Sequence, residues 1–336
     1  MYLTDEKVVV LGAAGAIGSN LAQTLLSSGT TSTVGMYDPF AKGLEGTAEE
    51  LYHCGFPNAN ITYTDDIGEA LTGASYIISS GGAPRKEGMT REDLLRDNAQ
   101  IAKQLGLNIK QHCPELKFGI IIFNPADITG LTTLVHSGLE PGRISTLAAL
   151  DSTRLQTKLS QHFKVLQSKV TGCRTYGGHG EQMAVFKGGI QIDGVALEDV
   201  LNGQTANGIG MSAQEWADVQ THIQGGGARI ISLRGRSSFQ SPAQQSVLML
   251  RGILGESYEW PSGAYVNTNG MNHIMMAMPA TLSSAGVSYT MPEGTEDDIK
   301  ALRESYAHVV ALRDEIITEG ILPPLSEWGT SNPHLA

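Results

Sequence analysis

One short segment constrains the fold of this chain more than any other: an apolar run, three spaced glycines and a helical pattern. The apolar run is Val8–Leu11, the glycines are Gly12, Gly15 and Gly18, and the helical pattern covers Ile17–Leu26. Gly12 allows a tight turn, Gly15 lets the backbone approach a phosphate, and Gly18 lets the helix pack close to the strand. The helix N-terminus then offers unpaired N–H groups and a positive dipole end. The segment predicts a strand–turn–helix unit that binds phosphate.

The first half of the chain continues to alternate short apolar runs with helical patterns. The expected strands are Val8–Leu11, Thr33–Tyr37, Ile61–Tyr63, Ala74–Ser79 and Phe118–Phe123, and the expected helices are Ile17–Leu26, Ala41–His53 and Thr90–Leu105. Strands of continuous apolar sequence joined by helices are typical of a parallel sheet covered on both faces. We predict an α/β fold, with a Rossmann doubly wound parallel sheet in residues 1–150.

The pattern changes after about Leu150. Strand candidates become longer and more polar, and hairpin signals and amphipathic helices follow. The expected strands are Lys169–Gly177 and Glu181–Gln191, the hairpin turns Lys187-Gly188-Gly189 and Asp193-Gly194, and the helices Ala213–Gln224, Pro242–Leu254 and Thr295–Glu319. We predict an α+β substrate or catalytic domain over residues 151–336. Two domains also suit 336 residues, since domains average about 150 residues.

Composition excludes several classes of protein. The chain has 23 Lys and Arg against 34 Asp and Glu, a net charge of -11, which disfavours nucleic acid and anionic membranes as partners. No apolar run reaches the roughly 18 residues that span a bilayer. Because an apolar run begins at Val8 after the short segment Met1–Lys7, we expect no signal or transit peptide. Cys54, Cys113 and Cys173 lack metal-site spacing and read as small core residues. We expect a reducing, cytoplasmic location.

Polar and small residues at two further strand ends indicate a dinucleotide site. Asp38 follows the second strand, 20 residues after Gly18, where a carboxylate binds ribose hydroxyls. The same charge would repel a 2′-phosphate, so NAD is favoured over NADP. Ser80, Gly81 and Gly82 follow the fourth strand, and their small size leaves room for a dinucleotide at the switch point of the sheet.

A loop with glycines near both ends begins at these small residues and runs from Gly81 to Arg91. It contains Arg85 and Arg91, six positions apart, and runs into a predicted helix. Loops at the carboxyl edge of a parallel sheet face the ligand crevice. We predict a lid that closes over the substrate and carries two cations.

A histidine between glycines is the candidate proton donor. His179 lies in Gly177-Gly178-His179-Gly180, which leaves the imidazole uncovered. A general acid needs that access and a pKa near the working pH. Asp151 is a candidate for the carboxylate that orients the imidazole and favours its charged form.

Six motifs occur along the chain in one order: GAAGAIG at 12–18, Asp38, APRKEGMTR at 83–91, Asn124-Pro125, LDSTR at 150–154 and GGHG at 177–180. As a set they resemble the malate/lactate dehydrogenase family, and within it the malate dehydrogenases. The resemblance is firm from Val8 to about Glu181 and looser afterwards. Glu181 and Phe123 depart from the residues that are commoner at their positions in the family.

The resemblance implies a catalytic role for each matching residue. His179 would give a proton to the 2-oxo group and remove it from the hydroxyl, paired with Asp151. Arg154 would bind the C1 carboxylate of the substrate, and Arg91 would polarise the carbonyl. Arg85 would bind the distal carboxylate.

Further residues are implied to line the ligand site. Asn124 would lie beside both nicotinamide and substrate, and Ser241 would contact the substrate. The implied cofactor-binding residues are Gly12, Ala14, Gly15, Ala16, Ile17, Gly18, Asp38, Ser80, Gly81, Gly82, Asn98 and Asn124. The implied cofactor is NAD, no metal is expected, and relatives assemble as homodimers or homotetramers.

The charges expected in the site favour a dicarboxylate as the substrate. Arg85, Arg91, Arg154 and protonated His179 would face Asp151 and the two carboxylates of oxaloacetate. A monocarboxylate such as pyruvate would leave Arg85 unpaired under a lid, at a cost of about 3–5 kcal/mol, or roughly two to four decades of discrimination. The expected reaction is therefore the NAD-dependent oxidation of (S)-malate to oxaloacetate, a step of the tricarboxylic acid cycle.

Three alternatives stay open at this point. A lactate or other 2-hydroxyacid dehydrogenase would use the same machinery on another substrate. An NAD-dependent glycosidase needs a metal held by Cys and His, and no such cluster follows His179 in the sequence. A nucleotide-binding regulator would need neither a proton donor nor the arginines. The run Met271–Met278 with His273 is read as a methionine-filled core strand rather than as a soft-metal site.

Overall fold

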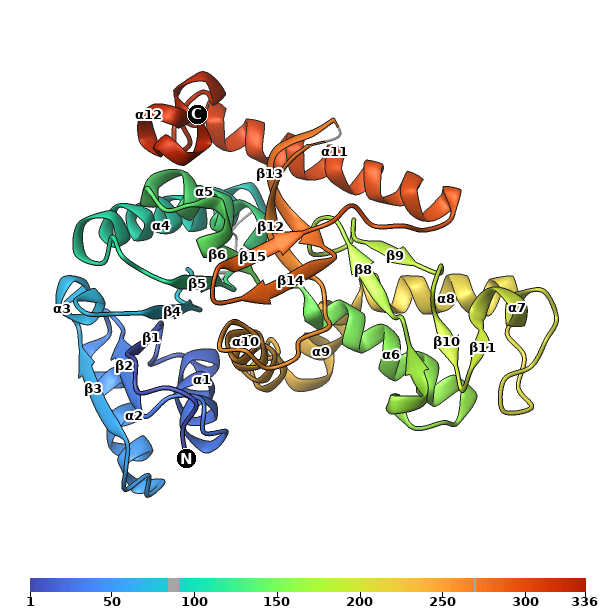
Figure 1. Ribbon diagram of the computed structural model, residues 1–336, viewed down its shortest axis with the longest axis horizontal. Helices are drawn as coiled ribbons and strands as arrows, with labels where there is room; N and C mark the ends of the chain where they lie inside the picture. The colour runs from blue at the N-terminus through green and yellow to red at the C-terminus, as the bar shows by residue number, and fades with distance from the viewer. Residues whose placement is uncertain (84–90, 269) are drawn as a thin grey trace.

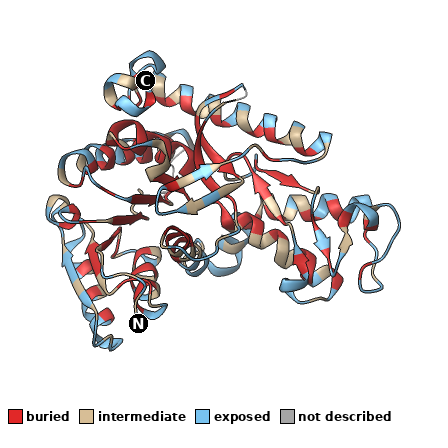
Figure 2. Ribbon diagram, in the orientation of Figure 1, coloured by how far each residue is buried: buried red, intermediate tan, exposed pale blue. Residues whose placement is uncertain are grey.

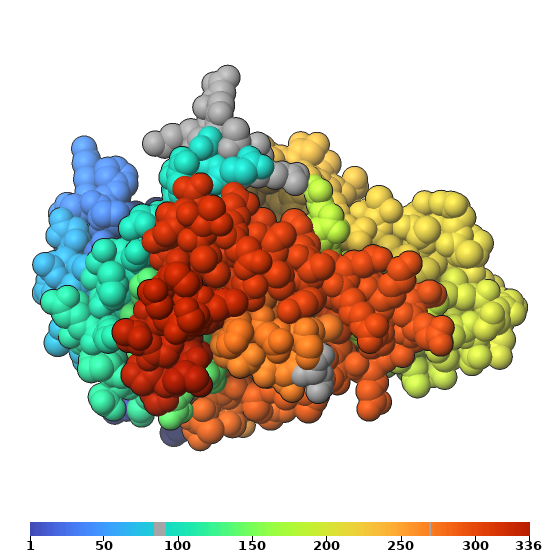
Figure 3. Space-filling model, turned by 90° about the horizontal axis from the view of Figure 1, so that it is seen from above, coloured from blue at the N-terminus to red at the C-terminus, as the bar shows by residue number. Residues whose placement is uncertain are grey.

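The computed structural model describes residues 1–83, 91–268 and 270–336, with the side chain of Arg91 excepted. Residues 84–90 of the predicted lid, Arg85 among them, therefore lie outside the described residues. The chain forms an elongated molecule with its blue N-terminal elements at one end and its yellow segments at the other (Figures 1 and 3).

The N-terminal half is built on a six-stranded parallel sheet in the order β3-β2-β1-β4-β5-β6. The strands are β1 Val8–Leu11, β2 Thr33–Tyr37, β3 Asn60–Thr64, β4 Tyr76–Ser79, β5 Phe118–Ile121 and β6 Ile144–Thr146. The strands run outward from β1 to β3 on one side and from β4 to β6 on the other, so the order of strand addition reverses between β1 and β4. This switch point opens a crevice at the carboxyl ends of the two strands. The doubly wound α/β prediction is confirmed, with β6 as a strand that the sequence did not indicate.

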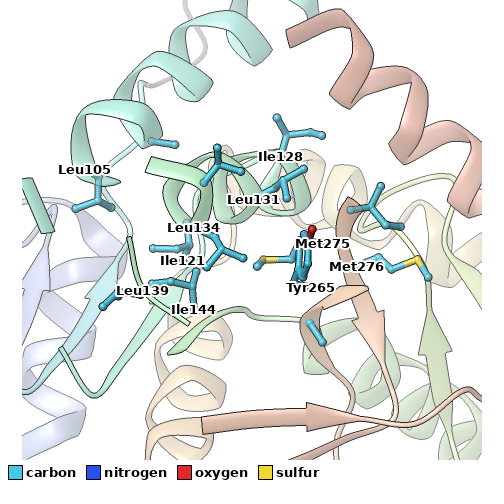
Figure 4. Close-up of a cluster of buried hydrophobic side chains, with 14 of the residues drawn as sticks. Leu105, Ile121, Ile128, Leu131, Leu134, Leu139, Ile144, Tyr265, Met275 and Met276 are labelled. Atoms are coloured by element: carbon cyan, nitrogen blue, oxygen red, sulfur yellow. The ribbon is translucent and has the colours of Figure 1, made fainter. Parts of the chain in front are cut away.

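Helices cover both faces of this sheet (Figure 1). The helices of this half are α1 Ala16–Ser27, α2 Ala41–His53, α3 Ile67–Leu71, α4 Arg91–His112 and α5 Ala126–Ser137. Successive strand residues point to opposite faces, so Val9 and Ile77 join the core under α4 and α5, whereas Val8 and Ile78 join the core with α1. Figure 4 shows part of the core under α4 and α5, where Ile121 of β5 contacts side chains of α5.

Two helices differ from the prediction. Helix α5 was not predicted because all of its residues are buried, and a helix buried all round has no amphipathic period. Helix α4 continues past Leu105 to His112. The helix continues through Gly106. This glycine serves helix packing, because a side chain at position 106 would overlap Thr133 and His136 of α5.

The second half mixes small antiparallel sheets with helices, as predicted for an α+β region. Its elements are α6 Ala149–Phe163, β7 Val170–Thr171, β8 Arg174–Tyr176, β9 Ala184–Phe186, β10 Gln191–Ile192, β11 Val195–Ala196, α7 Leu197–Leu201, α8 Ala213–Gln224, α9 Gly226–Arg234, α10 Gln240–Ile253, β12 Ser262–Thr268, β13 Met271–Met278, β14 Ala280–Ser283, β15 Gly286–Tyr289, α11 Glu296–Thr318 and α12 Trp328–Ser331. Helix α10 packs back against α1 and completes the cover of the parallel sheet (Figure 1).

The long strands predicted here are each broken in two. Gly172 (φ +71°) separates β7 from β8, and a side chain there would overlap the carbonyl of Gly189. Strand β9 pairs with β8, whereas β10 pairs with β7 and β11. The hairpin predicted at Lys187-Gly188-Gly189 is therefore wrong, because this segment joins two different sheets. The hairpin at Asp193-Gly194 is confirmed, with positive φ at both residues, 48° and 87°.

Burial tests the remaining structural predictions (Figure 2). Ile274, Met275 and Met276 of β13 are fully buried, so Met271–Met278 is a core strand as predicted. Cys113 and Cys173 are buried, but Cys54 is exposed at the end of α2, and its reading as a core residue is wrong. In the part of the chain that the structure describes, no helix is long and apolar enough to cross a membrane.

Candidate active site

The turn after β1 is a backbone cradle. Gly12 has φ +84°, and a Cβ there would lie 2.7 Å from Cα of Gly81. The N–H of Gly15 donates to the carbonyl of Gly12 at 3.1 Å, and Gly15 is the N-cap of α1, with no side-chain cap. A Cβ at Gly18 would overlap the Gly12 carbonyl. The cradle can exist only with glycines at 12 and 18.

The first residues of α1 therefore present free backbone N–H groups. Ala16, Ile17 and Gly18 occupy the first turn, where no N–H has a partner within the helix. These donors and the positive end of the helix dipole suit a pyrophosphate. The backbone cradle beside them is what a dinucleotide needs to approach the sheet.

Asp38 lies at the edge of a cavity of about 380 Å³ next to this cradle. Its Oδ2 accepts the N–H of Ala14 at 3.1 Å, and its Oδ1 accepts the N–H of Phe40 at 2.9 Å. Each oxygen can accept a further hydrogen bond, which suits the two hydroxyls of a ribose. Gly81 and Gly82 line the same cavity, and its apolar walls include Ile67, Ile101 and Leu105.

A second cavity of about 540 Å³ lies between the two halves of the chain. Ile17, Ser80, Asn98 and Asn124 line it from the first half, and Asp151, Arg154 and His179 from the second. Gly82 and Ala83 line both cavities. The cavity at Asp38 and the cavity at His179 thus share part of their wall.

The side chains of His179, Asp151 and Arg154 form one hydrogen-bonded set of charged groups in the wall of this cavity. The Nδ1 of His179 lies 2.7 Å from Oδ2 of Asp151, and the guanidinium of Arg154 donates to Oδ1 of Asp151 at 2.7 Å. The Asp151 side chain is 4% exposed, while the His179 side chain is 26% exposed. The carboxylate is thus sealed behind the imidazole, which remains open to a ligand. Asp151 and Arg154 share one face of α6 because they are three residues apart.

Charge pairing shifts the pKa values of His179 and Asp151. The charge of Asp151 raises the pKa of His179 above its ordinary value, against the opposing effect of burial. Burial alone would raise the pKa of Asp151, but the attraction of His179 and Arg154 holds it below its ordinary value. Both shifts favour the charged imidazole and the ionised carboxylate over their neutral forms.

A second buried carboxylate, which the sequence did not identify, contacts the histidine from behind. Asp127 is 5% exposed, and its Oδ2 accepts the backbone N–H of His179 at 2.7 Å. Burial raises the pKa of Asp127 to about 6. The signal in the sequence was an acid two residues after Asn124-Pro125, at the start of a helix that was not predicted.

Asn98 and Asn124 lie beside each other at the nucleotide side of the cavity. Asn98 is buried, its Oδ1 accepts the N–H of Ala83 at 2.7 Å, and its Nδ2 donates to the carbonyl of Asn124 at 2.6 Å. The amide of Asn98 thus ties together the chain segments after β4 and β5. Asn124 is exposed and lines the cavity, so its side chain is the more accessible of the two.

Three predicted site residues remain, Ser241, Arg85 and Arg91. Ser241 is exposed in the first turn of α10, and the cavity is lined instead by its neighbours Ser237, Ser238 and Pro242. Arg85 and the side chain of Arg91 lie outside the described residues. Glu181 lines the cavity and adds an acid to its wall.

The comparisons with known proteins agree with this geometry. Residues 6–146 match the NAD binding domain of lactate/malate dehydrogenase, and residues 148–316 match the alpha/beta C-terminal domain of the same family. The chain belongs to the lactate/malate dehydrogenase family. It is an NAD-dependent oxidoreductase that acts on a CH–OH group.

Individual relatives cover nearly the whole chain. A malate dehydrogenase of Picrophilus torridus is 29% identical over 324 residues, 91% of this chain and 95% of that protein. The solved malate dehydrogenase of Plasmodium falciparum is 26% identical, with a TM-score of 0.85 over 93% of this chain and 99% of that one. A lactate dehydrogenase of Cryptosporidium parvum superimposes with a TM-score of 0.84 over 92% of this chain and 97% of that one, but at 24% identity it shows the fold alone.

Proposed function

We propose that this chain catalyses the reversible oxidation of (S)-malate to oxaloacetate with NAD. The observation that carries the proposal is the hydrogen-bonded set His179, Asp151 and Arg154, which lines a cavity that shares Gly82 and Ala83 with the cavity beside Asp38. The Picrophilus relative, named a malate dehydrogenase, supports malate as the substrate. Family membership also argues against the glycosidase and regulator alternatives.

Each described residue has one task in the proposed reaction. NAD, held by the cradle at Gly12, Gly15 and Gly18 and by Asp38, would supply or accept the hydride at the carbon that bears the oxygen. His179 Nδ1 is engaged by Asp151, which leaves Nε2 to give a proton to the carbonyl oxygen or to take it from the hydroxyl. Arg154, with its side chain 23% exposed, can bind the C1 carboxylate through the N–H groups that Asp151 does not use. In oxidation the substrate loses a hydride and a proton, and His179 holds the proton.

The charge of the cavity supports a dianion. With Arg85 and Arg91 as the resemblance assigns them, four cations would face the site, counting Arg154 and protonated His179. Asp151 and Glu181, both in the cavity wall, match two of these cations. The two carboxylates of oxaloacetate match the other two, whereas pyruvate would leave one cation unpaired, at a cost of about 3–5 kcal/mol.

Parallel turnover assays test the substrate. The purified protein should oxidise NADH with oxaloacetate at least about a hundredfold faster, in kcat/KM, than with pyruvate or branched 2-oxo acids. Arg85→Gln should remove most of this preference by losing activity on oxaloacetate far more than on pyruvate. Lys86→Gln, a matched loss of charge at the next position, should keep the preference.

The same assays identify the alternative. Preference for pyruvate in the unmodified protein would make the chain a lactate dehydrogenase, and preference for another 2-oxo acid would make it a different 2-hydroxyacid dehydrogenase. Equal losses on both substrates in Arg85→Gln would show that Arg85 does not select the substrate. We further propose a cytoplasmic homodimer or homotetramer with domains at 1–150 and 151–336, acting in the tricarboxylic acid cycle.

A further inference from the structure

The backbone that leads into His179, from Gly177 to the N–H of His179 itself, is held by three separate elements. Gly177 exchanges two backbone hydrogen bonds with Ala277 of β13, at 3.0 and 2.8 Å. Gly178 donates its N–H to Oγ of Ser305 on α11 at 2.9 Å, and His179 donates its N–H to Oδ2 of Asp127 on α5 at 2.7 Å. Three consecutive N–H groups are thus fixed by three elements. The peptide that carries the imidazole is clamped before any ligand binds.

The clamp is also closely packed. A Cβ at Gly178 would lie 2.6 Å from a methyl group of Val309 on α11 and 3.5 Å from Oδ2 of Asp127. Asp127 is 5% exposed and Ser305 is 1% exposed. Water therefore has little access to compete for the N–H groups of Gly178 and His179.

Asp127 differs from the other members of the clamp because it is a carboxylic acid. A simpler explanation for an acid at this position is available, since Asp127 lies in the first turn of α5 and complements the helix dipole. An acid placed only for that purpose gains from being ionised. Burial instead raises the pKa of Asp127 to about 6, so at neutral pH the protein holds this carboxylate ionised at a cost.

The charged surroundings of His179 explain what this carboxylate does. Asp127 faces the histidine from α5, and Asp151 and Arg154 face it from α6. The other contacts of the clamp come from Ala277, Ser305 and Val309, which carry no charge. Glu181 lines the wall of the same cavity. Both buried carboxylates favour the charged imidazole and Arg154 opposes it.

We propose that Asp127 is a positioning residue for the proton transfer: it fixes the backbone of His179 by a charged hydrogen bond and, together with Asp151, favours the protonated imidazole. The inference rests on the proposed role of His179 as acid and base. Asp127 acts through His179 and need not touch the substrate.

Two variants separate the charge of Asp127 from its hydrogen bond. Asp127→Asn keeps an acceptor oxygen for the N–H of His179 but removes the charge. Ser305→Ala is the matched control, because it removes a neighbouring hydrogen bond of the same clamp without removing a charge. The direct readout is the NMR titration of histidine-labelled protein, in which His179→Asn identifies the His179 resonance.

We expect Asp127→Asn to lower the pKa of His179 by on the order of 0.5–1, as for loss of a nearby opposite charge. Ser305→Ala should leave that pKa in place. The pH profiles should follow: the acid limb of hydroxy-acid oxidation and the alkaline limb of 2-oxo-acid reduction should both move to lower pH in Asp127→Asn. Asp127→Ala should lower kcat by about tenfold or more, with little change in the Kd of NADH measured by fluorescence.

Opposite results would overturn the inference. An unchanged titration of His179 in Asp127→Asn would show that the carboxylate does not act on the imidazole. A normal kcat in Asp127→Ala would show that the charged hydrogen bond does not position it. The NMR titration and the NADH Kd require no turnover, so they remain decisive even if the chain proves to act on a substrate other than malate.

Discussion

The Oδ2 of Asp151 and the Nδ1 of His179 lie 2.7 Å apart, although the two residues are 28 positions apart in the chain. The other oxygen of Asp151 accepts from Arg154, also at 2.7 Å. One buried carboxylate thus holds both the proton donor and the cation proposed to bind the substrate carboxylate. The distance between the two groups is fixed by α6 and by the clamp around His179 rather than by the ligand.

Asp151→Asn should impair the reaction through the acidity of His179. The charge of Asp151 is the largest cause of the raised pKa of His179, so its removal lowers that pKa. Reduction needs the protonated imidazole, and its alkaline limb should move to lower pH. We expect kcat to fall by about 10²–10⁴-fold, the usual contribution of general acid–base catalysis. The pH dependence of kcat/KM for reduction measures this, and an unshifted limb would contradict it.

Asp127→Asn should stabilise the protein at neutral pH. The pKa of Asp127 rises from its ordinary value of 3.8 to about 6 on folding, so the folded state is favoured when this carboxyl is protonated. That stability is fully present below about pH 4 and is lost as pH rises through about 6, at roughly 3 kcal/mol in total. An asparagine at this position does not ionise, so the variant loses no stability from this group over the same pH range.

Thermal unfolding of both proteins from pH 4 to 7.5 checks this expectation. The Tm difference between Asp127→Asn and the unmodified protein should grow with pH and level off above about 7. A variant that is less stable than the unmodified protein at pH 7.5 would show that the ionised carboxylate is needed to begin α5.

The nucleotide end of the molecule could be predicted from the sequence because its signals are local. Gly12, Gly15 and Gly18 lie close together in the sequence, in the turn after β1 and the start of α1. Asp38 follows a strand of clear apolar sequence. Helix α5 could not be predicted, because a helix buried on every side shows no period. The broken strands around Gly172 could not be predicted either, since the break depends on the carbonyl of Gly189.

The catalytic part of the site was harder to predict, because it is formed by contacts between residues that are far apart in the sequence. The glycines around His179 indicated an accessible histidine, and the family resemblance supplied its pairing with Asp151. Asp127 escaped notice because its partner is a backbone N–H 52 residues away, and no side-chain pattern records such a contact. The resemblance that indicates Ser241 is looser in this part of the chain, and its neighbours Ser237 and Ser238 line the cavity instead.

Asp38→Ser should relax the preference between the two nicotinamide cofactors. The carboxylate lies at the edge of the cavity beside the cradle, where a 2′-phosphate would meet a like charge. Its removal should raise the ratio of kcat/KM for NADPH to that for NADH by about 10–100-fold. Asp5→Ser, which removes an exposed acid outside both cavities, should leave the ratio unchanged. A strong preference of the unmodified protein for NADPH would refute the role proposed for Asp38.

Gly18→Ala should damage both the cradle and the fold. A Cβ at Gly18 would overlap the carbonyl of Gly12, so α1 must move away from β1. We expect a loss of about 1–3 kcal/mol in unfolding free energy, as for other overpacked sites, and a weaker Kd for NADH because the N–H groups of α1 move. Gly46→Ala in α2 is the matched control, since nothing lies within 4 Å of its Cβ position and alanine favours a helix. Denaturant unfolding and NADH fluorescence measure both effects, and normal NADH affinity in Gly18→Ala would show that close packing of this helix is not what forms the phosphate site.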